Sequence, residues 1–439
     1  MVNSEHRAPR RVVITGLGVV TSIGTGPAEF LTGLRTGRSG VKPITSFDTS
    51  GYAYANGCEI ADFDPAEWIE RIDPDELGRA SQFSVAAARM AVADAGMDLD
   101  ALRRRRALVT IGTTDGESHD LDELMEQQLA DGPEKLDPVV ARRSSAGLLS
   151  SSVVRELALS DVEAVTIPTA CAAGNYAIGS GFDAIRAGET EVALAGGADA
   201  VCRKTFTGFY RLGTIAPEVC QPFDADRQGI LTGEGAGVLF MESLDSALAR
   251  GARIYAEVLG YGLNCDAHHP VAPDQESLAA CMALAHRNAG VKPEDIDFIS
   301  AHGTGTKAND VTEAGAIRQV FPEPPPTVSI KSMLGHTMGA ASALATAACA
   351  LAVTEGFIPP TINHRRTDPD CGLDPVPNEA RPADVRIVQN NALAFAGNNA
   401  VLILARYESG QGGQGSQSGQ SGQSGQGGSR HHRSGGAAA

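Results

Sequence analysis

Apolar residues along this chain occur in short β-branched runs that alternate with longer alanine-rich stretches of helical period. The runs predict strands at residues 11–15, 191–195, 252–259, 296–300, 327–330 and 400–405. The stretches predict helices at residues 81–95, 172–187, 277–289 and 339–353. The last helix holds almost only small and apolar residues, so we expect it to be buried on all sides. Strands that alternate with helices over short connections predict an α/β fold of βαβ units with mainly parallel sheets.

The order of these elements divides the chain into two similar halves and a tail. We expect an N-terminal half at residues 1–255 and a C-terminal half at 256–408, because each begins with a strand and carries a long helix. Residues 113–145 are polar and punctuated by Pro and Gly, which indicates a cap or dimerisation segment inserted in the first half. Residues 409–439 contain no core-forming run and are predicted to be disordered.

Composition narrows the class of protein. A net charge of −17 disfavours binding to nucleic acid or to an anionic membrane. We find no apolar run long enough to span a membrane and no apolar leader at the N-terminus. The eight cysteines are scattered without C-x-x-C pairs, as in a reducing cytoplasm. An acidic protein partner would need a local basic patch, for which the candidates are residues 103–106, 142–143 and 203–204 with Arg211.

Cys171 is the first candidate for chemistry. It follows the β-branched run at residues 165–167 and precedes the helix that Gly188 closes. Unpaired N–H groups and the positive end of the helix dipole favour the thiolate, so we expect a lowered pKa. An isolated cysteine is more often an inert core residue. The interpretation as a nucleophile therefore depends on other motifs.

Three segments place polar residues directly after predicted strands, where open α/β sheets hold their functional sites. They are residues 300–306 (SAHGTGT, followed by Asp310 and Glu313), 329–336 (SIKSMLGH) and 391–399 (NALAFAGNN). Each segment is weak alone, because a histidine after a strand is often structural. Together with residues 222–227 (PFDADR) and 233–237 (GEGAG), the set is highly specific.

With these motifs in this order, the sequence resembles the β-ketoacyl synthases, the condensing enzymes of fatty-acid and polyketide synthesis. The resemblance covers about residues 10–407 and is greatest to elongating, type II enzymes that use acyl carrier protein. It implies a thiolase-like fold, with two duplicated halves in a layered αβαβα sandwich. It also implies that no cofactor or metal is bound, because the carrier protein brings its own phosphopantetheine.

The resemblance assigns Cys171 as the nucleophile that accepts an acyl chain from the carrier protein. His302 and His336 would then assist decarboxylation of a malonyl thioester, whose carbanion condenses with the acyl group. Decarboxylation needs hydrogen-bond donors at the developing enolate oxygen, and two neutral imidazole rings supply them.

The remaining assignments from the resemblance concern supporting residues. Lys331 would anchor the His336 loop through an ion pair with Glu313. Thr304 and Thr306 match positions that bind the phosphopantetheine arm. Phe395 matches the gate between the acyl and malonyl sites, and its N–H group and that of Cys171 match the oxyanion hole.

Departures from the family pattern favour a specialised, polyketide-type substrate over an ordinary fatty acid. The gate loop, usually FGFGGTN, reads LAFAGNN at residues 393–399, and alanine in place of two glycines is expected to remove positive φ angles and stiffen the loop. Asp115 falls on the expected wall of the acyl pocket, where a carboxylate is a poor neighbour for a saturated chain. We expect Asp115 to face solvent or to pair across an interface.

Three rival classes are weighed against this interpretation. The non-catalytic chain-length factors share the fold but lack the cysteine, and starter-type condensing enzymes carry asparagine where His336 stands. Thiolases use a second cysteine in place of the two histidine motifs. The pairs His268–His269 and His431–His432 are expected to be inert toward metals. Expected partners are acyl carrier protein and a second subunit, in a homodimer or in a heterodimer with a chain-length-factor-like protein.

Overall fold

The computed structural model describes residues 9–408, and most of its strands join one large sheet. The strands of this sheet are β1 (Val12–Thr21), β2 (Gly24–Thr25), β5 (Ala107–Gly112), β6 (Val162–Ile167), β7 (Val192–Asp199), β9 (Gly235–Ser243), β10 (Ala256–Cys265), β11 (Phe298–Ser300), β12 (Thr327–Val328), β15 (Ile387–Leu393) and β16 (Asn398–Ala405). They follow the order β12-β11-β15-β16-β10-β1-β9-β7-β5-β6, and β2 pairs with β1. Two small sheets join β3 (Lys42–Pro43), β4 (Asn56–Cys58) and β8 (Thr232–Gly233), and β13 (Phe357–Ile358) with β14 (Arg381–Pro382).

The sheet is mixed, so the expectation of mainly parallel pairing is wrong. Strand β1 is antiparallel to both β9 and β10, and the pairs β7–β9, β10–β16 and β15–β16 are antiparallel too. Parallel pairing is confined to β5 with its neighbours β6 and β7 and to β11 with its neighbours β12 and β15. The antiparallel strands lie between the two parallel groups. The pairing of β1 with β10 joins the strands of the two halves of the chain into one sheet.

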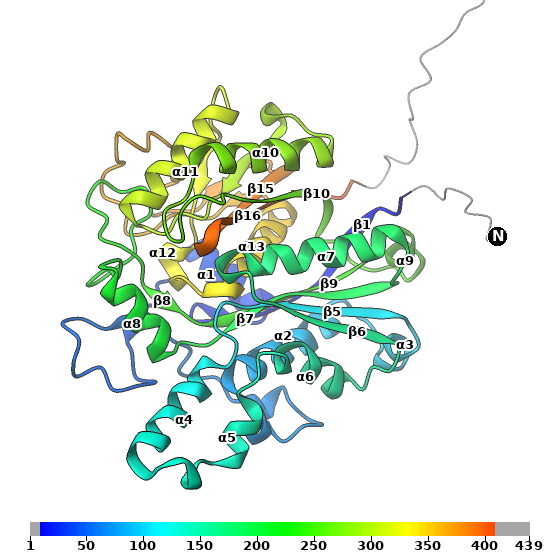
Figure 1. Ribbon diagram of the computed structural model, residues 1–439. Coiled ribbons are helices and arrows are strands. Elements are labelled where there is room, and N and C mark those ends of the chain that lie inside the picture. Colours follow the sequence, from blue (N-terminus) through cyan, green and yellow to red (C-terminus); the bar gives the residue numbers. More distant parts are fainter. Residues whose placement is uncertain (1–8, 409–439) are drawn as a thin grey trace, which may run out of the picture. The chain divides into compact units, whose positions relative to one another are not determined.

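Helices lie on both faces of this sheet and between its two parts. They are α1 (Pro27–Thr36), α2 (Arg79–Asp94), α3 (Leu99–Arg103), α4 (Ser118–Asp131), α5 (Pro138–Arg143), α6 (Leu148–Leu157), α7 (Ala173–Ala187), α8 (Arg203–Arg211), α9 (Leu244–Ala249), α10 (Gln275–Ala289), α11 (Lys307–Val320), α12 (Lys331–Leu334) and α13 (Ala341–Glu355). Figure 1 shows α2 and α6 below the β5–β6–β7–β9 part, α10 and α11 above the β15–β16 part, and α7 and α13 between them. This is the layered αβαβα arrangement that the resemblance implies.

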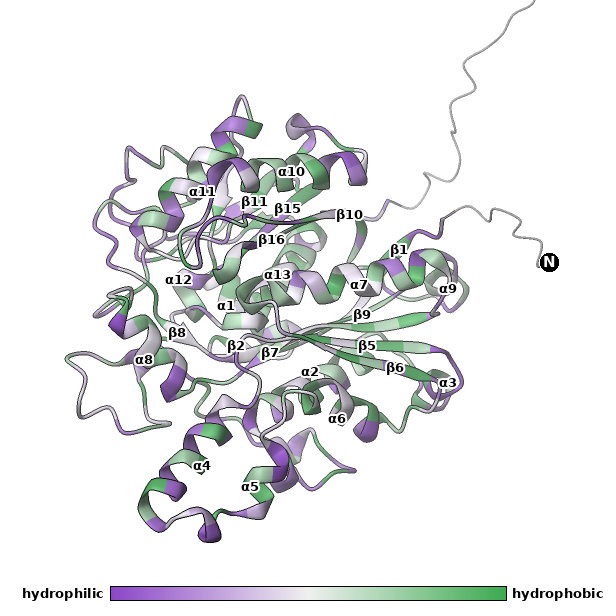
Figure 2. Cartoon of the chain, viewed as in Figure 1, coloured by the Kyte–Doolittle hydropathy of each residue, from purple (hydrophilic) through white to green (hydrophobic). Residues whose placement is uncertain are grey.

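Helix α13 is the centre of the core. Every residue from Ala341 to Val353 is buried, as its composition predicts. The stretch Met338–Glu355 has the length and hydropathy of a membrane span, contrary to the expectation that no such run exists. Because 89 % of it is buried inside the protein, its apolar character is explained by core packing. Figure 2 shows the same hydrophobic colouring on the inner helices and on β5, β6 and β9.

The predicted elements are present with shifted ends. Helix α7 begins at Ala173 and closes at Gly188, whose φ of 80° confirms the predicted C-cap. The segment 113–145 forms α4 and α5. Residues 9–407 pack as one unit, and the boundary at residue 255 stays a prediction. The predicted disordered tail lies outside the described residues.

Asn175, on α7, joins the two halves by hydrogen bonds. Its Nδ2 donates to the carbonyl oxygens of Asn390 and Ala400, on β15 and β16, at 3.2 and 3.3 Å. Its Oδ1 accepts from Thr346 Oγ1 on α13 and from Asn390 Nδ2, each at 3.2 Å. All of these groups are shielded from water, so each depends on the others for its hydrogen bonds.

Replacing Asn175 by alanine should therefore destabilise the whole fold. Buried donors and acceptors lose their partner at about 1–3 kcal/mol each, so we expect the free energy of unfolding in urea to fall by at least about 2 kcal/mol. Asn288→Ala is the control, because Asn288 is exposed and makes one bond, to the Tyr261 carbonyl oxygen at 2.8 Å. Equal effects of the two changes would contradict the proposed junction.

Candidate active site

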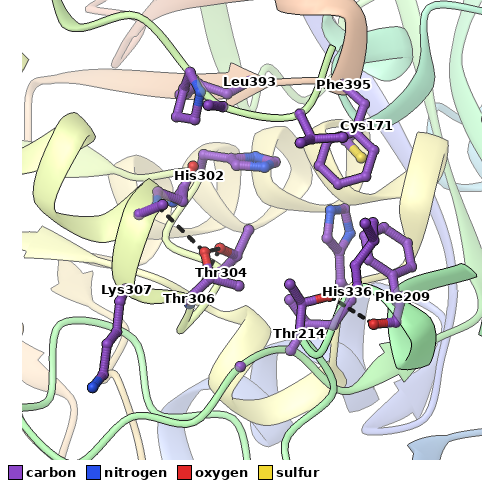
Figure 3. A pocket seen from close by; sticks show the side chains of 18 of the residues that line it. Cys171, Phe209, Thr214, His302, Thr304, Thr306, Lys307, His336, Leu393 and Phe395 are labelled. Atoms are coloured by element: carbon purple, nitrogen blue, oxygen red, sulfur yellow. Dashed lines mark hydrogen bonds between the residues drawn. The ribbon is translucent and has the colours of Figure 1, made fainter. Parts of the chain in front are cut away.

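Cys171 lies in a short 3-10 turn between β6 and α7. The turn spans Ala170–Ala172, and Ala170 adopts a φ of 50°. A positive φ is uncommon for a residue with a side chain, and here it allows a sharp change from strand to helix. The turn places the sulfur at the wall of a cavity of about 490 Å³, with only 5 % of Cys171 exposed (Figure 3).

Burial, rather than the helix dipole, controls the state of the thiol. Loss of solvent raises the pKa of Cys171 to about 12, so the expectation of a lowered pKa is wrong. The charge of Lys331 lowers this pKa, and the carboxylates of Asp115 and Asp199 raise it. Desolvation acts on the full charge of a thiolate, whereas a helix end offers only partial charges. The resting side chain is a thiol that must lose its proton as it attacks.

The two predicted histidines line the same cavity as Cys171. The ring centroids of His302 and His336 are 5.4 Å apart, and the ring planes meet at 81°. Burial, followed by the nearby charge of Lys331, lowers the pKa of both rings well below the ordinary histidine value. Both imidazoles are therefore neutral at physiological pH, as the predicted chemistry requires.

Hydrogen bonds to Nδ1 fix the tautomer of each ring. The backbone N–H of Met338 donates to His336 Nδ1 at 3.1 Å, which leaves the ring proton on Nε2. Lys331 Nζ lies 3.5 Å from His302 Nδ1, and an ammonium group can only donate. Each ring therefore has its proton on Nε2, available to a group bound in the cavity (Figure 3).

Lys331 and Glu313 hold the His302 loop, not the His336 loop. Lys331 Nζ donates to the His302 carbonyl oxygen at 2.6 Å. The Glu313 carboxylate accepts from the backbone N–H groups of His302 and Gly303, both at 2.8 Å, and from Asn391 Nδ2 at 3.1 Å. The prediction that Lys331 pairs directly with Glu313 is wrong, because the main chain of His302 lies between the two charges.

A second carboxylate on α11 supports the rest of this loop. Asp310 Oδ1 accepts from the backbone N–H groups of Thr304 and Gly305 at 3.1 and 3.2 Å. Its other oxygen accepts from the backbone N–H of Phe223 at 2.8 Å and lies 3.5 Å from buried Arg227. Asp310 therefore ties the PFDADR motif to the HGTGT motif.

The mouth of the cavity combines two hydroxyl groups with exposed apolar side chains. Thr304 Oγ1 and Thr306 Oγ1 are 3.0 Å apart, and both residues line the cavity. Phe395 is 36 % exposed, and its ring lies 5.3 Å from that of Phe209. Figure 3 shows Phe395 beside Cys171, at the position expected of a gate. The oxyanion role of the two backbone N–H groups stays a prediction.

Contrary to expectation, the gate loop keeps two adjacent positive φ angles, one at Gly397 (φ 80°) and the other at an alanine. Ala396 has φ 66° and ψ 9°, whereas Ala394 is extended. An alanine in this left-handed region is strained by about 1 kcal/mol relative to glycine. The backbone N–H of Ala396 donates to the Pro270 carbonyl oxygen at 2.8 Å, which holds the strained residue in place.

Asp115 does not face solvent, so that expectation is wrong, and the expected pairing across an interface stays a prediction. Only 2 % of its side chain is exposed, and Oδ1 lies 2.8 Å from Lys204 Nζ and 2.5 Å from Thr205 Oγ1. Lys204 is on α8, so the pair forms within the chain. Sequence reasoning also assigned no role to Asp199, which is buried beside Asp115 and for which the end of the GGAD strand was the available signal.

Of the two histidine pairs, His268–His269 lies within the described residues. His269 lies at the cavity mouth, where its Nδ1 accepts from the backbone N–H groups of Val271 and Ala272. Across residues 9–408, no three His, Cys, Asp or Glu side chains are placed to hold a metal ion together. His431 and His432 lie outside the described residues.

The fold and the cavity, with one cysteine and two neutral histidines, define a thiolase-fold condensing enzyme. Family models match both halves: the β-ketoacyl synthase N-terminal domain at residues 9–247 and the C-terminal domain at residues 255–365. The chain belongs to the β-ketoacyl synthase family, whose members are condensing acyltransferases.

Similar proteins include an acyl-carrier-protein synthase and a nodulation protein. The chain is 36 % identical to 3-oxoacyl-acyl-carrier-protein synthase 2 of Synechocystis, over 93 % of this chain and 100 % of the relative. It is 40 % identical to nodulation protein E of a Rhizobium strain, over 90 % of this chain and 98 % of the relative.

Solved structures show the same likeness. The ishigamide ketosynthase/chain length factor is 64 % identical, with a TM-score of 0.90 over 91 % of this chain and 100 % of that chain. A type II polyketide ketosynthase in complex with its acyl-carrier protein is 30 % identical, with a TM-score of 0.83 over 91 % of this chain and 100 % of that chain.

Alkylation of Cys171 should report its raised pKa. Only the thiolate reacts with iodoacetamide, so the rate at Cys171 should rise about tenfold per pH unit from pH 7 to 10 without a plateau. Peptide mass spectrometry separates Cys171 from the other free cysteines, and urea-unfolded protein is the control, with a plateau above about pH 9. A plateau near pH 7 in the folded protein would show that the helix dipole lowers the pKa of Cys171 by more than burial raises it.

Proposed function

We propose that this chain is a β-ketoacyl synthase that extends an acyl chain bound to acyl carrier protein, in a type II polyketide or related specialised pathway. The proposal depends on one observation: the Cys171 thiol lines the same cavity as His302 and His336, whose Nε2–H groups can donate hydrogen bonds. The proposed reaction needs no bound cofactor, because the phosphopantetheine arm arrives with the carrier protein.

The first step is acyl transfer. The sulfur of Cys171 attacks the carbonyl carbon of the acyl thioester, and the carrier thiol leaves with the proton that Cys171 gives up. A thiol suits this step because it attacks thioesters readily and later leaves again. The backbone N–H groups of Cys171 and Phe395 are the proposed donors to the tetrahedral oxyanion.

The second step is condensation. Malonyl-acyl carrier protein enters past Thr304 and Thr306, and the bond between its carboxylate and its methylene carbon breaks to release carbon dioxide. The electron pair forms an enolate, whose oxygen accepts hydrogen bonds from Nε2 of His302 and His336. The enolate carbon attacks the carbonyl carbon of the acyl thioester, the bond from that carbon to the Cys171 sulfur breaks, and the departing thiolate takes a proton from water.

The pathway is argued from similarity and from the site. Identity of 64 % to a ketosynthase/chain-length-factor structure exceeds the 36 % to a fatty-acid type relative, which favours specialised synthesis over housekeeping fatty-acid elongation. A non-catalytic chain-length-factor role is disfavoured, because Cys171 and both histidines are present. A cytoplasmic location follows from the substrates.

An acidic carrier protein would need a basic docking site, because the chain itself has a net charge of −17. Most of the candidate patches are already engaged, since Arg103, Arg106, Arg143, Arg203 and Lys204 all form ion pairs within the chain. Within residues 9–408, exposed Arg211 and Lys307 form none. Lys307 lines the cavity, and Arg211 directly precedes Leu212, which is exposed and also lines the cavity. The carrier protein therefore docks there.

A second subunit of the same fold is the proposed partner at strand β6. This strand ends the sheet and pairs only with β5 in the described part of the chain. The bonds from Ala107 N to Asp161 O and from Thr113 N to Ile167 O direct odd-numbered residues of β6 toward β5. The N–H of Ala164 therefore faces outward, ready to pair with another strand edge. Similarity to a ketosynthase/chain-length-factor structure favours a heterodimer.

The variant Cys171→Gln tests the division of roles. The glutamine amide stands in for the acyl thioester, so malonyl-acyl carrier protein should still release carbon dioxide while condensation stops. Adding His336→Ala should slow that release by about 10²-fold, the usual effect of losing one oxyanion donor. Absence of carbon dioxide release from Cys171→Gln, or an acyl adduct on Cys171→Ala by intact mass, would refute the assignment.

The edge pairing is tested with Ala164→Pro, which removes one outward N–H and leaves the bonds to β5. We expect the wild-type chain, co-expressed with a partner of the same fold, to sediment as a dimer at micromolar concentration, and Ala164→Pro to sediment as a monomer. Ala164→Thr keeps the N–H and is the matched control. A dimer that survives the proline would place the interface elsewhere.

A further inference from the structure

Asp199 is a buried carboxylate outside the cavity that the reaction described above does not use. It ends β7 and is fully buried. Its Oδ1 accepts from Thr113 Oγ1 at 2.5 Å and from the backbone N–H of Asp115 at 3.0 Å. Its Oδ2 accepts from the backbone N–H groups of Thr114 at 2.8 Å and Gly339 at 2.6 Å. Three of these donors lie directly after β5, but Gly339 belongs to the other half of the chain.

Gly339 belongs to the 3-10 turn Met338–Ala340, which follows His336. The turn packs closely against the ends of β5 and β7. A Cβ on Gly339 would lie 2.4 Å from the Cα of Thr113, and a Cβ on Gly197 would lie 2.4 Å from the Gly339 carbonyl oxygen. Met338 itself has a φ of 49°, which is strained for a side chain of this size. Such a turn persists only where its surroundings hold it.

The same turn carries the donor that sets the tautomer of His336. The N–H of Met338 reaches His336 Nδ1 at 3.1 Å, one residue before the N–H that Asp199 holds. If the turn rotates, His336 Nδ1 loses its donor, and the ring proton is free to move there from Nε2. The donor that faces the cavity is then lost in part of the molecules.

We propose that Asp199 is a positioning residue for malonyl decarboxylation, acting through the Met338–Ala340 turn to keep the proton of His336 on Nε2. This inference rests on the proposed role of His336. It assigns the N-terminal half a part in the second step as well as in the first, because β7 of that half fixes a histidine of the other.

The test compares the two half-reactions in Asp199→Asn. In this variant an amide NH₂ group replaces one carboxylate oxygen of Asp199. This group cannot accept hydrogen bonds from the N–H and O–H groups around it, so the Met338–Ala340 turn is held less firmly. We expect release of carbon dioxide from malonyl-acyl carrier protein to fall at least tenfold, since a full loss of one donor is worth about 10²–10³. Acylation of Cys171 should not fall by more than about twofold, because removing the Asp199 charge lowers the pKa of the thiol. Equal loss in both half-reactions, or no loss in either, would overturn the inference.

Glu156→Gln is the matched control. Its carboxylate is also buried and also accepts from backbone N–H groups, those of Glu70, Arg71 and Ile72, but it does not line the cavity. Both half-reactions should stay within about twofold of wild type. If Glu156→Gln reproduced the selective loss, the effect would be general to buried carboxylates and the inference would fail.

A spectroscopic readout keeps the test independent of activity. In ¹⁵N-histidine-labelled protein, His336 should show a protonated Nε2 and an unprotonated Nδ1 in the wild type, and a mixture of both tautomers in Asp199→Asn. His336→Gln identifies the signals. An unchanged tautomer refutes the inference whether or not the protein decarboxylates malonyl groups, whereas inactive wild-type protein with the expected tautomer shift counts only against the proposed function.

Thr113→Val is the milder variant if Asp199→Asn does not fold. It removes one of the four donors and leaves the carboxylate in place, so the same selective loss should appear at about two- to fivefold. The absence of any selective loss or tautomer shift in Thr113→Val would then overturn the inference.

Discussion

The peptide backbone of His302 lies between two buried opposite charges, and the geometry of the cavity depends on this arrangement. The Glu313 carboxylate accepts its N–H, and the Lys331 ammonium donates to its carbonyl oxygen. A single buried charge would cost several kcal/mol, whereas two charges bridged by a polar backbone offset one another. The bridge fixes the position of the ring and uses both charges without placing either in contact with substrate.

Exclusion of water has opposite effects on the three reactive groups, and these effects suit the same reaction. It raises the pKa of the Cys171 thiol and lowers that of His302 and His336, so all three are uncharged at rest. A neutral ring is a hydrogen-bond donor that does not attract the malonyl carboxylate, and it therefore favours loss of that carboxylate as carbon dioxide. The nearby charge of Lys331 strengthens the neutral state of both rings.

Much of the fold could be predicted from local pattern, because the signals were local. Helix α7 follows from its small residues and Gly188, and helix α13 from its lack of any polar face. The pairing of β1 with β9 and β10 could not, since β1 and β9 are buried on both faces and carry no alternation that would fix their direction. The motifs indicated which residues meet in the site. They did not indicate the atoms through which Lys331 and Glu313 act, or the intrachain partner of Asp115, because those contacts depend on distant elements.

Strand β6 has a consequence for how the protein is made. Its outward N–H and C=O groups will bind any backbone of suitable shape that reaches them first. Each newly folded molecule therefore exposes a strand edge to which other strands can bind. A molecule that meets no matching strand edge is therefore open to aggregation through β6, whatever the stability of its own fold.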